Sequence, residues 1–174
     1  LFLVKSYSES NLLDQGIKLC ITGKLKKDFY SNQVRDIVRT HPGILLTGYV
    51  SENEKLDLYL NAIALLSPSL VEGFGIPVLD AACLGMNALV SDSDSHLEIQ
   101  SIDDFKKYVH IAQTLDSFDW ALGIQALVFQ QKNLYANPSL ERVRRLTRYN
   151  QKSSDIMKIF HTQINKLIIP KKAD

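Results

Sequence analysis

Two acidic residues, Glu72 and Asp80, enclose a short segment that contains two glycines, Gly73 and Gly75. The segment follows an apolar run and leads into a sequence with helical periodicity. Glycines lack side chains, so backbone N–H groups can approach a ligand closely, and the first turn of a helix adds unpaired N–H groups at the positive end of its dipole. The pattern therefore predicts a binding site for an anion, and a diphosphate fits it well.

The two carboxylates of this segment have different expected roles. Asp80 lies about one turn inside the expected helix, where bound phosphate would repel it, so its paired acceptor oxygens suit ribose hydroxyls better. Glu72 lies at the mouth and could accept hydrogen bonds from sugar hydroxyls. The backbone of residues 75–78 should form the anion-binding surface, although Pro77 has no N–H. Taken alone, the spacing favours a simpler interpretation, an acidic helix start beside a glycine turn.

The elements that would position these residues can be read along the chain. Apolar runs predict five strands, at residues 17–23, 44–50, 62–67, 88–91 and 108–112. Helical patterns lie between them, at residues 28–40, 51–61 and 76–84. The second of these helices opens on a capping box formed by Ser51 and Glu54. The strand before the glycine segment and the helix after it are therefore both expected.

Apolar strands that alternate with helices are typical of a parallel sheet covered on both faces, so the fold class is α/β and Rossmann-like. Ligands bind such sheets at the carboxyl ends of the strands, where the glycine segment lies. We assign residues 1–115 to this core and residues 116–174, where only helical patterns occur, to C-terminal helices of the same domain. The amphipathic pattern over residues 140–167 has an expected interruption near residues 150–154.

Composition excludes several classes of partner. Of 174 residues, 45% are hydrophobic and 22% are charged, with 20 Lys plus Arg against 19 Asp plus Glu. This balance gives no reason to expect nucleic acid or an anionic membrane as the partner. The tail over residues 142–172 is basic, and we favour a solvated helix face over contact with another domain or a membrane. No apolar run approaches the ~20 residues of a membrane span, so the cytoplasm is the expected location.

Cysteine and histidine give no sign of a metal site. Cys20 and Cys83 lie in apolar runs and are predicted to be small buried side chains rather than a disulfide or a metal pair. The spacing of metal ligands is also absent among the four histidines, which are His41, His96, His110 and His161. We expect all four to be structural. His96 is the one that could touch a ligand, because it is expected in the loop after the fourth strand.

The stretch PSLVEGFGIPVLDAACLGMNALVSD resembles the E-x7-E signature of the glycosyl transferases group 1 family. Upstream, LCITGK and LTGYVSENEKLDLYLNAIALLSPS resemble the same family in the same order, over about residues 17–98. The family consists of retaining enzymes with the GT-B fold. The resemblance implies a donor-binding domain of an enzyme that moves a sugar from a nucleoside diphosphate sugar to an acceptor hydroxyl, with retention of configuration and no metal or other cofactor.

The resemblance also implies roles for individual residues. Glu72 matches the first motif acid, which contacts the donor sugar and is the expected catalytic residue, and Asp80 matches the second acid, which holds the ribose. Backbone groups of the segment between them would bind the donor sugar and phosphates. The remaining nucleotide-sugar contacts fall on Gly23, Lys24, Tyr49, Val50, Ser51, Gly73, Phe74, Gly75 and Ile76.

The chain departs from the family pattern in four ways, one of which, Gly85-Met86-Asn87 in place of Gly-Thr-Pro, is expected to be a packing variation. Asp80 is one methylene shorter than the usual Glu, so ribose contact could need a water molecule. The Gly-Asp step expected after residues 97–99 is absent. The Arg and Lys that neutralise the donor diphosphate in the family precede its first helix, where this chain begins without a Met. We therefore expect the chain to be cut from a longer protein, without the first strand of the sheet and the N-terminal acceptor-binding domain.

Two other functions stay open at this level. A nucleotide-sugar epimerase of related fold has a similar donor site, although its pattern of catalytic acids and histidine is not evident here. A degenerate, non-catalytic domain that serves interaction is the second alternative, and Asp80 and the absent Gly-Asp step favour it. For the parent protein, the donor sugar and the missing N-terminal domain are the expected partners, and peripheral contact with the inner face of a membrane stays open.

Overall fold

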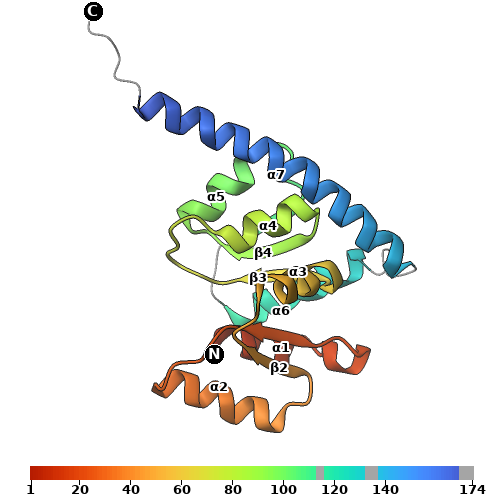
Figure 1. Ribbon diagram of the computed structural model, residues 1–174. Coiled ribbons are helices and arrows are strands. Elements are labelled where there is room, and N and C mark those ends of the chain that lie inside the picture. Colours follow the sequence, from red (N-terminus) through yellow and green to blue (C-terminus); the bar gives the residue numbers. More distant parts are fainter. Residues whose placement is uncertain (113–115, 132–136, 169–174) are drawn as a thin grey trace, which may run out of the picture.

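A computed structural model of the chain describes residues 1–112, 116–131 and 137–168, with side chains described through residue 156 (Figure 1). Five strands are present in this part of the chain. They are β1 (Leu19–Thr22), β2 (Ile44–Gly48), β3 (Ala64–Ser67), β4 (Asn87–Ser91) and β5 (Val109–Ala112). Every strand pairing is parallel. The predicted α/β fold class, with parallel strands flanked by helices, is confirmed.

The helices fill the intervals between the strands. They are α1 (Phe2–Glu9), the 3-10 turn η1 (Leu12–Gln15), α2 (Phe29–Thr40), α3 (Glu52–Asn61), α4 (Ile76–Leu84), α5 (Asp94–Ser101), α6 (Ser117–Gln131) and α7 (Pro138–Ile168). The predictions for α2, α3 and α4 are confirmed. Helix α5 was missed, because only Leu97 and Ile99 are apolar in it and they form no periodic stripe. The interruption expected near residues 150–154 is wrong, since α7 is continuous there.

The sheet β3–β4–β5 is covered on both faces. Ala88 and Val90 of β4 pack in one cluster with α4, whereas Leu89 between them packs in a second cluster with α1 and α6. This alternation follows from the two-residue period of a strand. Figure 1 shows α7 lying across α4 and α5 above the sheet, and α6 beneath it. All five residues of β4 are buried as a result.

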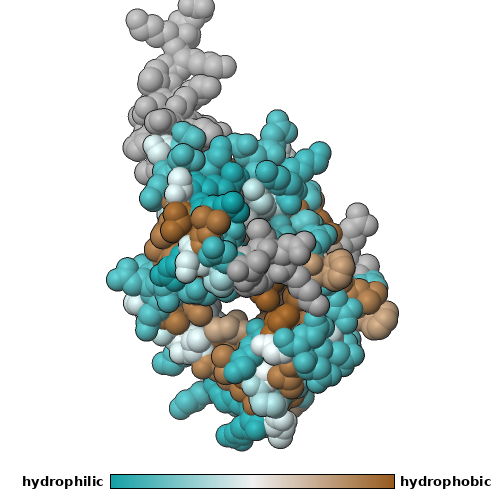
Figure 2. All heavy atoms as spheres, turned by 90° about the vertical axis from the view of Figure 1, so that its right-hand side faces the viewer, coloured by the Kyte–Doolittle hydropathy of each residue, from teal (hydrophilic) through white to brown (hydrophobic). Residues whose placement is uncertain are grey.

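The strands β1 and β2 form a separate sheet. In a single five-stranded sheet of order β2-β1-β3-β4-β5, strands β1 and β3 would be neighbours. Within the described residues they are not hydrogen-bonded, and the strands divide into the pair β1-β2 and the triple β3-β4-β5. Both β1 and β3 therefore keep one unpaired edge. Figure 2 shows a hollow in the middle of one face of the molecule, with hydrophobic residues along part of its edge.

Basic side chains attach α7 to the rest of the domain. Arg145 is 2% exposed, and its Nη1 donates to the carbonyl oxygens of Tyr59 and Ala62 at 2.8 Å each, at the end of α3. Arg148 lies over the ring of Tyr108 at 4.8 Å. The interpretation of the basic tail as a solvated face is therefore wrong for Arg145. Its guanidinium satisfies carbonyl groups that a helix end leaves unpaired.

The burial predicted for the two cysteines is confirmed for one and wrong for the other. Cys83 is buried in α4, as predicted, but Cys20 is exposed, and the expectation that it is buried is wrong. The apolar run around Cys20 predicted a strand with both faces covered, whereas β1 leaves the face with Cys20 open.

Among the described residues, no helix is both long and apolar enough to cross a bilayer.

Candidate functional site

The glycine segment connects the end of β3 to the start of α4. Gly75 is the N-cap residue of α4 and has a left-handed backbone with φ 71°. A side chain at this position would be strained by that backbone and would also meet Ile99 Cδ1 at 3.2 Å and Glu72 Oε2 at 3.6 Å. Among the described residues, no side chain caps the helix start. Glycine therefore fits this position best, and the helix start carries no side-chain cap from the part of the chain that the structure describes.

The hydrogen bonds of the first turn narrow the predicted anion-binding surface. The N–H groups of Val78 and Leu79 both donate to the carbonyl oxygen of Gly75, at 2.9 and 3.0 Å. The expectation that the Val78 N–H faces the ligand is therefore wrong. Pro77 has no N–H, so the surface reduces to Ile76 and the loop before it. Phe74 is 41% exposed and Ile76 is 58% exposed beside this surface.

Glu72 lies against the inner side of the loop. Its side chain is 23% exposed, and its Oε2 lies 3.8 Å from Nε2 of His96. The expectation that His96 sits in a loop at the pocket mouth is wrong. His96 belongs to the first turn of α5 and is fully buried beneath the glycine segment. The sequence did not predict that His96 is buried in a helix, because α5 lacks an apolar stripe. Ser93 and Asp94, which are typical of a helix start, could have indicated the helix.

Asp80 faces α3 from the second turn of α4. Burial is the main cause that raises the pKa of its carboxyl, Lys55 lowers the pKa in part, and Glu52 adds to the increase. The side chain is only half-buried. Within the described residues, no hydrogen bond or ion pair engages the Asp80 carboxylate. Burial also raises the pKa of the Cys83 thiol, one turn further on, to about 11.

The other predicted contacts lie at the carboxyl ends of β1 and β2. The N–H of Gly23 donates to the carbonyl oxygen of Gly48 at 2.7 Å, so Lys24 and Tyr49 follow two adjacent chain segments. Lys24 is exposed, and Tyr49 is 88% exposed. Ser51 is the N-cap of α3 and forms the predicted capping box, which is confirmed.

The predicted site residues form two groups rather than one. Gly23, Lys24 and residues 49–51 lie at the end of the β1–β2 pair, and residues 72–80 follow β3. Figure 1 shows that both groups leave their strands on the left side of the view. The Gly23–Gly48 hydrogen bond holds the first group together, and in the second group Glu72 lies against Gly75.

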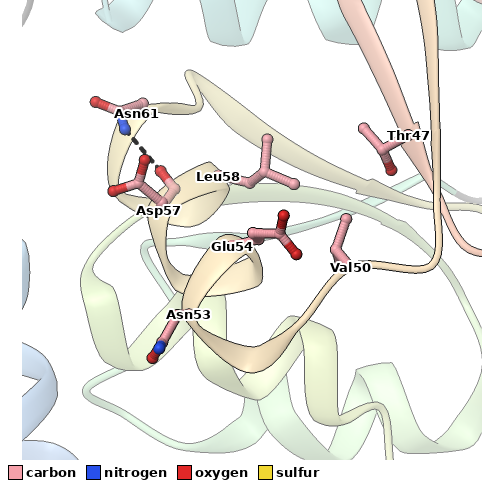
Figure 3. A pocket seen from close by; sticks show the side chains of 7 residues that line it. All are labelled: Thr47, Val50, Asn53, Glu54, Asp57, Leu58 and Asn61. Atoms are coloured by element: carbon pink, nitrogen blue, oxygen red, sulfur yellow. Dashed lines mark hydrogen bonds between the residues drawn. The ribbon is translucent and has the colours of Figure 1, made fainter.

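A hollow of about 570 Å³ opens beside α3 (Figure 3). It is lined by Thr47, Val50, Asn53, Glu54, Asp57, Leu58 and Asn61. Val50 is the one predicted site residue in this lining. With 3.6 residues per turn, these α3 residues lie on the face away from Lys55 and Tyr59, which point toward α4. The hollow is therefore separate from the glycine segment.

The charges of this hollow do not suit a diphosphate. Glu54 and Asp57 both contribute carboxylates, which repel phosphate. Both are also engaged within the protein: Glu54 Oε2 accepts from the Ser51 N–H at 2.7 Å, and Asp57 Oδ1 accepts from Arg142 at 2.6 Å. The geometry of the glycine segment, not the size of this hollow, identifies the candidate anion site.

Similar sequences occur in known proteins. The glycosyl transferases group 1 family matches residues 2–151, more than half of the chain. A serotype-specific mannosyltransferase WbdA from Escherichia coli is 27% identical over 123 residues, which cover 65% of this chain and 15% of that protein. A second Escherichia coli protein of the same name is 27% identical over 122 residues, covering 64% of this chain and 15% of that protein. On the extent of the family match, the chain belongs to the glycosyl transferases group 1 family.

Proposed function

We propose that this chain is the donor-binding domain of a retaining glycosyltransferase, which moves a sugar from a nucleoside diphosphate sugar to an acceptor hydroxyl. The observation that carries the proposal is the uncapped start of α4 behind the left-handed Gly75, with Glu72 beside it. Helix N-termini of this kind favour phosphate through unpaired N–H groups and the helix dipole. The parent enzyme would stabilise the departing diphosphate by charge and position, without a metal or other cofactor.

Each predicted residue has a part in this proposal. The loop Gly73, Phe74 and Gly75 and the N–H of Ile76 bind the phosphates and the donor sugar. Glu72 binds sugar hydroxyls near the anomeric carbon. Burial raises the pKa of the half-buried Asp80 carboxyl. In this proposal the carboxylate binds the ribose hydroxyls, which would supply hydrogen bonds that the described residues do not supply. The remaining group borders the nucleotide and consists of Gly23, Lys24, Tyr49, Val50 and Ser51.

The rest of the parent protein completes the site in this proposal. The unpaired edges of β1 and β3 support a further parallel strand between them, in the order that a six-stranded sheet of this type adopts. The same part of the parent would supply the cationic groups for the diphosphate and the acceptor-binding domain. Residues 1–115 and 116–174 would then act as one donor-binding unit. A cytoplasmic location, with peripheral contact to the inner face of a membrane, is part of the proposal for the parent.

The named relatives suggest the class of sugar. Both are called mannosyltransferases, so we propose a hexose donor, with mannose tested first, and a role in polysaccharide biosynthesis. The matched region is 15% of the length of those proteins, so their acceptor and their full activity need not extend to this chain.

Nucleotide binding by the full-length parent tests the proposal. Isothermal titration with UDP, GDP and ADP should show that one nucleotide binds with a heat signal, and Asp80→Ala should weaken its binding. Sugar transfer should then fall steeply in Glu72→Ala. If no nucleotide binds at millimolar concentration, the donor-site proposal is wrong. Unchanged transfer in Glu72→Ala would favour a non-catalytic domain, and conversion of the donor to its epimer without transfer would favour an epimerase.

A further inference from the structure

His96 is the one fully buried ionisable side chain that contacts the proposed site among the described residues. It sits under the loop between β3 and α4, with Cδ2 3.4 Å from the position that a Cβ on Gly75 would take. Its Nδ1 lies 3.0 Å from the carbonyl oxygen of Ser91, at the end of β4. Its Nε2 lies 3.4 Å from Oγ of Ser67, at the end of β3, and 3.8 Å from Oε2 of Glu72. The ring therefore connects two strand ends to the acidic residue of the loop.

The proton on Nδ1 follows from its neighbours. A carbonyl oxygen only accepts hydrogen bonds, so Nδ1 must donate to Ser91. The Ser91 hydroxyl, 3.3 Å from Nδ1, donates its own hydrogen to the carbonyl oxygen of Ser69, so it can only accept from the ring. Both Ser91 oxygens thus require a proton on Nδ1. Any change in the charge of the ring must occur at Nε2, on the side of Glu72.

The two states of Nε2 have opposite consequences for Glu72. A protonated Nε2 donates toward the Glu72 carboxylate and attracts it. A bare Nε2 presents a lone pair that accepts from the Ser67 hydroxyl and repels the carboxylate. Burial of the ring strengthens either effect, because the local dielectric is low.

We propose that His96 is a positioning residue, which holds the Glu72 carboxylate in place through Nε2 while Nδ1 is anchored to the backbone of Ser91. The inference rests on the proposed role of Glu72 at the donor sugar. Because His96 does not touch the donor, its effect reaches the reaction through the orientation of Glu72. Orientation errors of about 1 Å at a reacting centre cost on the order of 100-fold in rate.

Glu72 is the charged group that faces the ring. The residues contributed by β3 and β4, Ser67 and Ser91, are uncharged. On α5 itself and just before it, Asp92, Asp94 and Glu98 are exposed and point to solvent. The acid of α4, Asp80, interacts with Lys55 and Glu52 of α3 instead. A change of charge at Nε2 is therefore transmitted to Glu72.

A matched pair of variants in the full-length parent separates positioning from a structural role. His96→Gln places an amide N–H near the position of Nε2, so it keeps a donor toward Glu72 and loses the bond to Ser91. His96→Asn places an amide near the position of Nδ1, so it keeps the bond to Ser91 and cannot reach Glu72. The measurements are kcat and KM for sugar transfer, together with the melting temperature.

The two variants should have opposite effects on kcat and on the melting temperature. His96→Asn should lower kcat by about 10- to 100-fold with little change in melting temperature. His96→Gln should keep most of kcat and lower the melting temperature, because it keeps a donor toward Glu72 and loses the bond to Ser91. If His96→Asn retains wild-type kcat, or if the two variants have the same kcat, His96 is only structural and the inference is wrong.

A second measurement applies if either variant fails to fold. In the full-length protein with labelled histidine, Glu72→Gln should move the NMR signal of Nε2 of His96 and leave that of Nδ1 in place. Absence of that change overturns the inference. The same measurement separates the two proposals: a parent that transfers no sugar refutes the proposed function, whereas the coupling between Glu72 and His96 is decided by the spectrum.

Discussion

The strands of the two sheets are similarly apolar, but their surroundings differ. The three-stranded half consists of β3, β4 and β5 with α4, α5 and α7, and the two-stranded half consists of β1 and β2 with α2. Strand β4 is buried at all five positions. Strand β2 is equally apolar, yet Leu45 is 45% exposed and Leu46 is 36% exposed. The apolar residues of both halves predict coverage on two faces, and only the three-stranded half has it.

The difference shows what an apolar run does and does not specify. The run specifies that a strand forms, because both faces can be buried. It does not specify which segment covers it. In the three-stranded half the cover comes from α4 on one face and from α1 and α6 on the other, all in the same chain. In the two-stranded half the exposed leucines and the open edge of β1 fit a cover from another segment, as proposed above for the parent.

The largest expected contrast uses one leucine from each half. Leu84→Ala removes a side chain that is 1% exposed in the core around α4, so the free energy of unfolding should fall by about 2–5 kcal/mol. Leu46→Ala in the 174-residue chain should cost less than about 1 kcal/mol, because water already reaches the side chain. Urea denaturation measures both. Equal losses would mean that the two halves are equally well packed, whereas a larger loss for Leu46→Ala in the full-length parent would reveal its cover.

The second contrast lies on α7, which closes the three-stranded half. Arg145→Ala leaves the carbonyl oxygens of Tyr59 and Ala62 and the carboxylate of Glu141 without their partner in a buried place, at a cost of about 3 kcal/mol. Arg142→Ala removes an exposed ion pair with Asp57 and should cost about 0.5 kcal/mol or less. Denaturation of the two variants measures the difference. Similar costs would mean that α7 is not attached through Arg145.

Arg145 also shows which structural features the sequence alone does not predict. Features that depend on near neighbours could be predicted, and the capping box of Ser51 and Glu54 and the start of α4 at Ile76 are confirmed. Arg145 lies in a basic stretch that is indistinguishable from a solvated face. Its burial depends on carbonyl groups about 85 residues away, at the end of α3. Local sequence patterns do not predict contacts between residues so far apart in the chain.

The site divides in the same way. The residue types and spacing of the loop from Glu72 to Asp80 predicted its place between a strand and a helix. The position of His96 under that loop was not predictable, because it requires the ends of β3 and β4 to lie side by side. The residue pattern of β1 and β3 does not show the break between them, since both are short apolar runs, although the family resemblance implied a missing first strand. The roles of the site residues in binding a donor stay predictions.

The third contrast compares two glycines with nearly the same backbone. Gly85, after α4, has φ 72°, and a Cβ there would lie 2.9 Å from Cδ of Arg148, which is held over Tyr108. Gly85→Ala should cost about 2 kcal/mol from the backbone and the displaced side chain. Gly16, before β1, has φ 74° and no atom within 4 Å of such a Cβ, so Gly16→Ala should cost about 1 kcal/mol. Equal costs by thermal denaturation would assign the whole effect to the backbone.

The smallest expected effect concerns the charge of Asp80 in the three-stranded half. Because burial raises the pKa of this carboxyl, its ionised form opposes folding above that pKa. Asp80→Asn should therefore raise the melting temperature slightly at neutral pH, and the gain should vanish as pH falls through the range in which Asp80 takes up a proton. The measurement is the melting temperature as a function of pH.

Asp104 provides a control of opposite sign. The hydrogen bond from Lys152 lowers the pKa of the Asp104 carboxyl, so Asp104→Asn should slightly lower the melting temperature at neutral pH, with the loss disappearing in acid. Only Asp80→Asn should also weaken nucleotide binding in the full-length parent. A carboxylate that opposes folding and supports binding is expected at a ligand site. If Asp80→Asn stabilises the protein and leaves nucleotide binding unchanged, Asp80 does not hold the ribose.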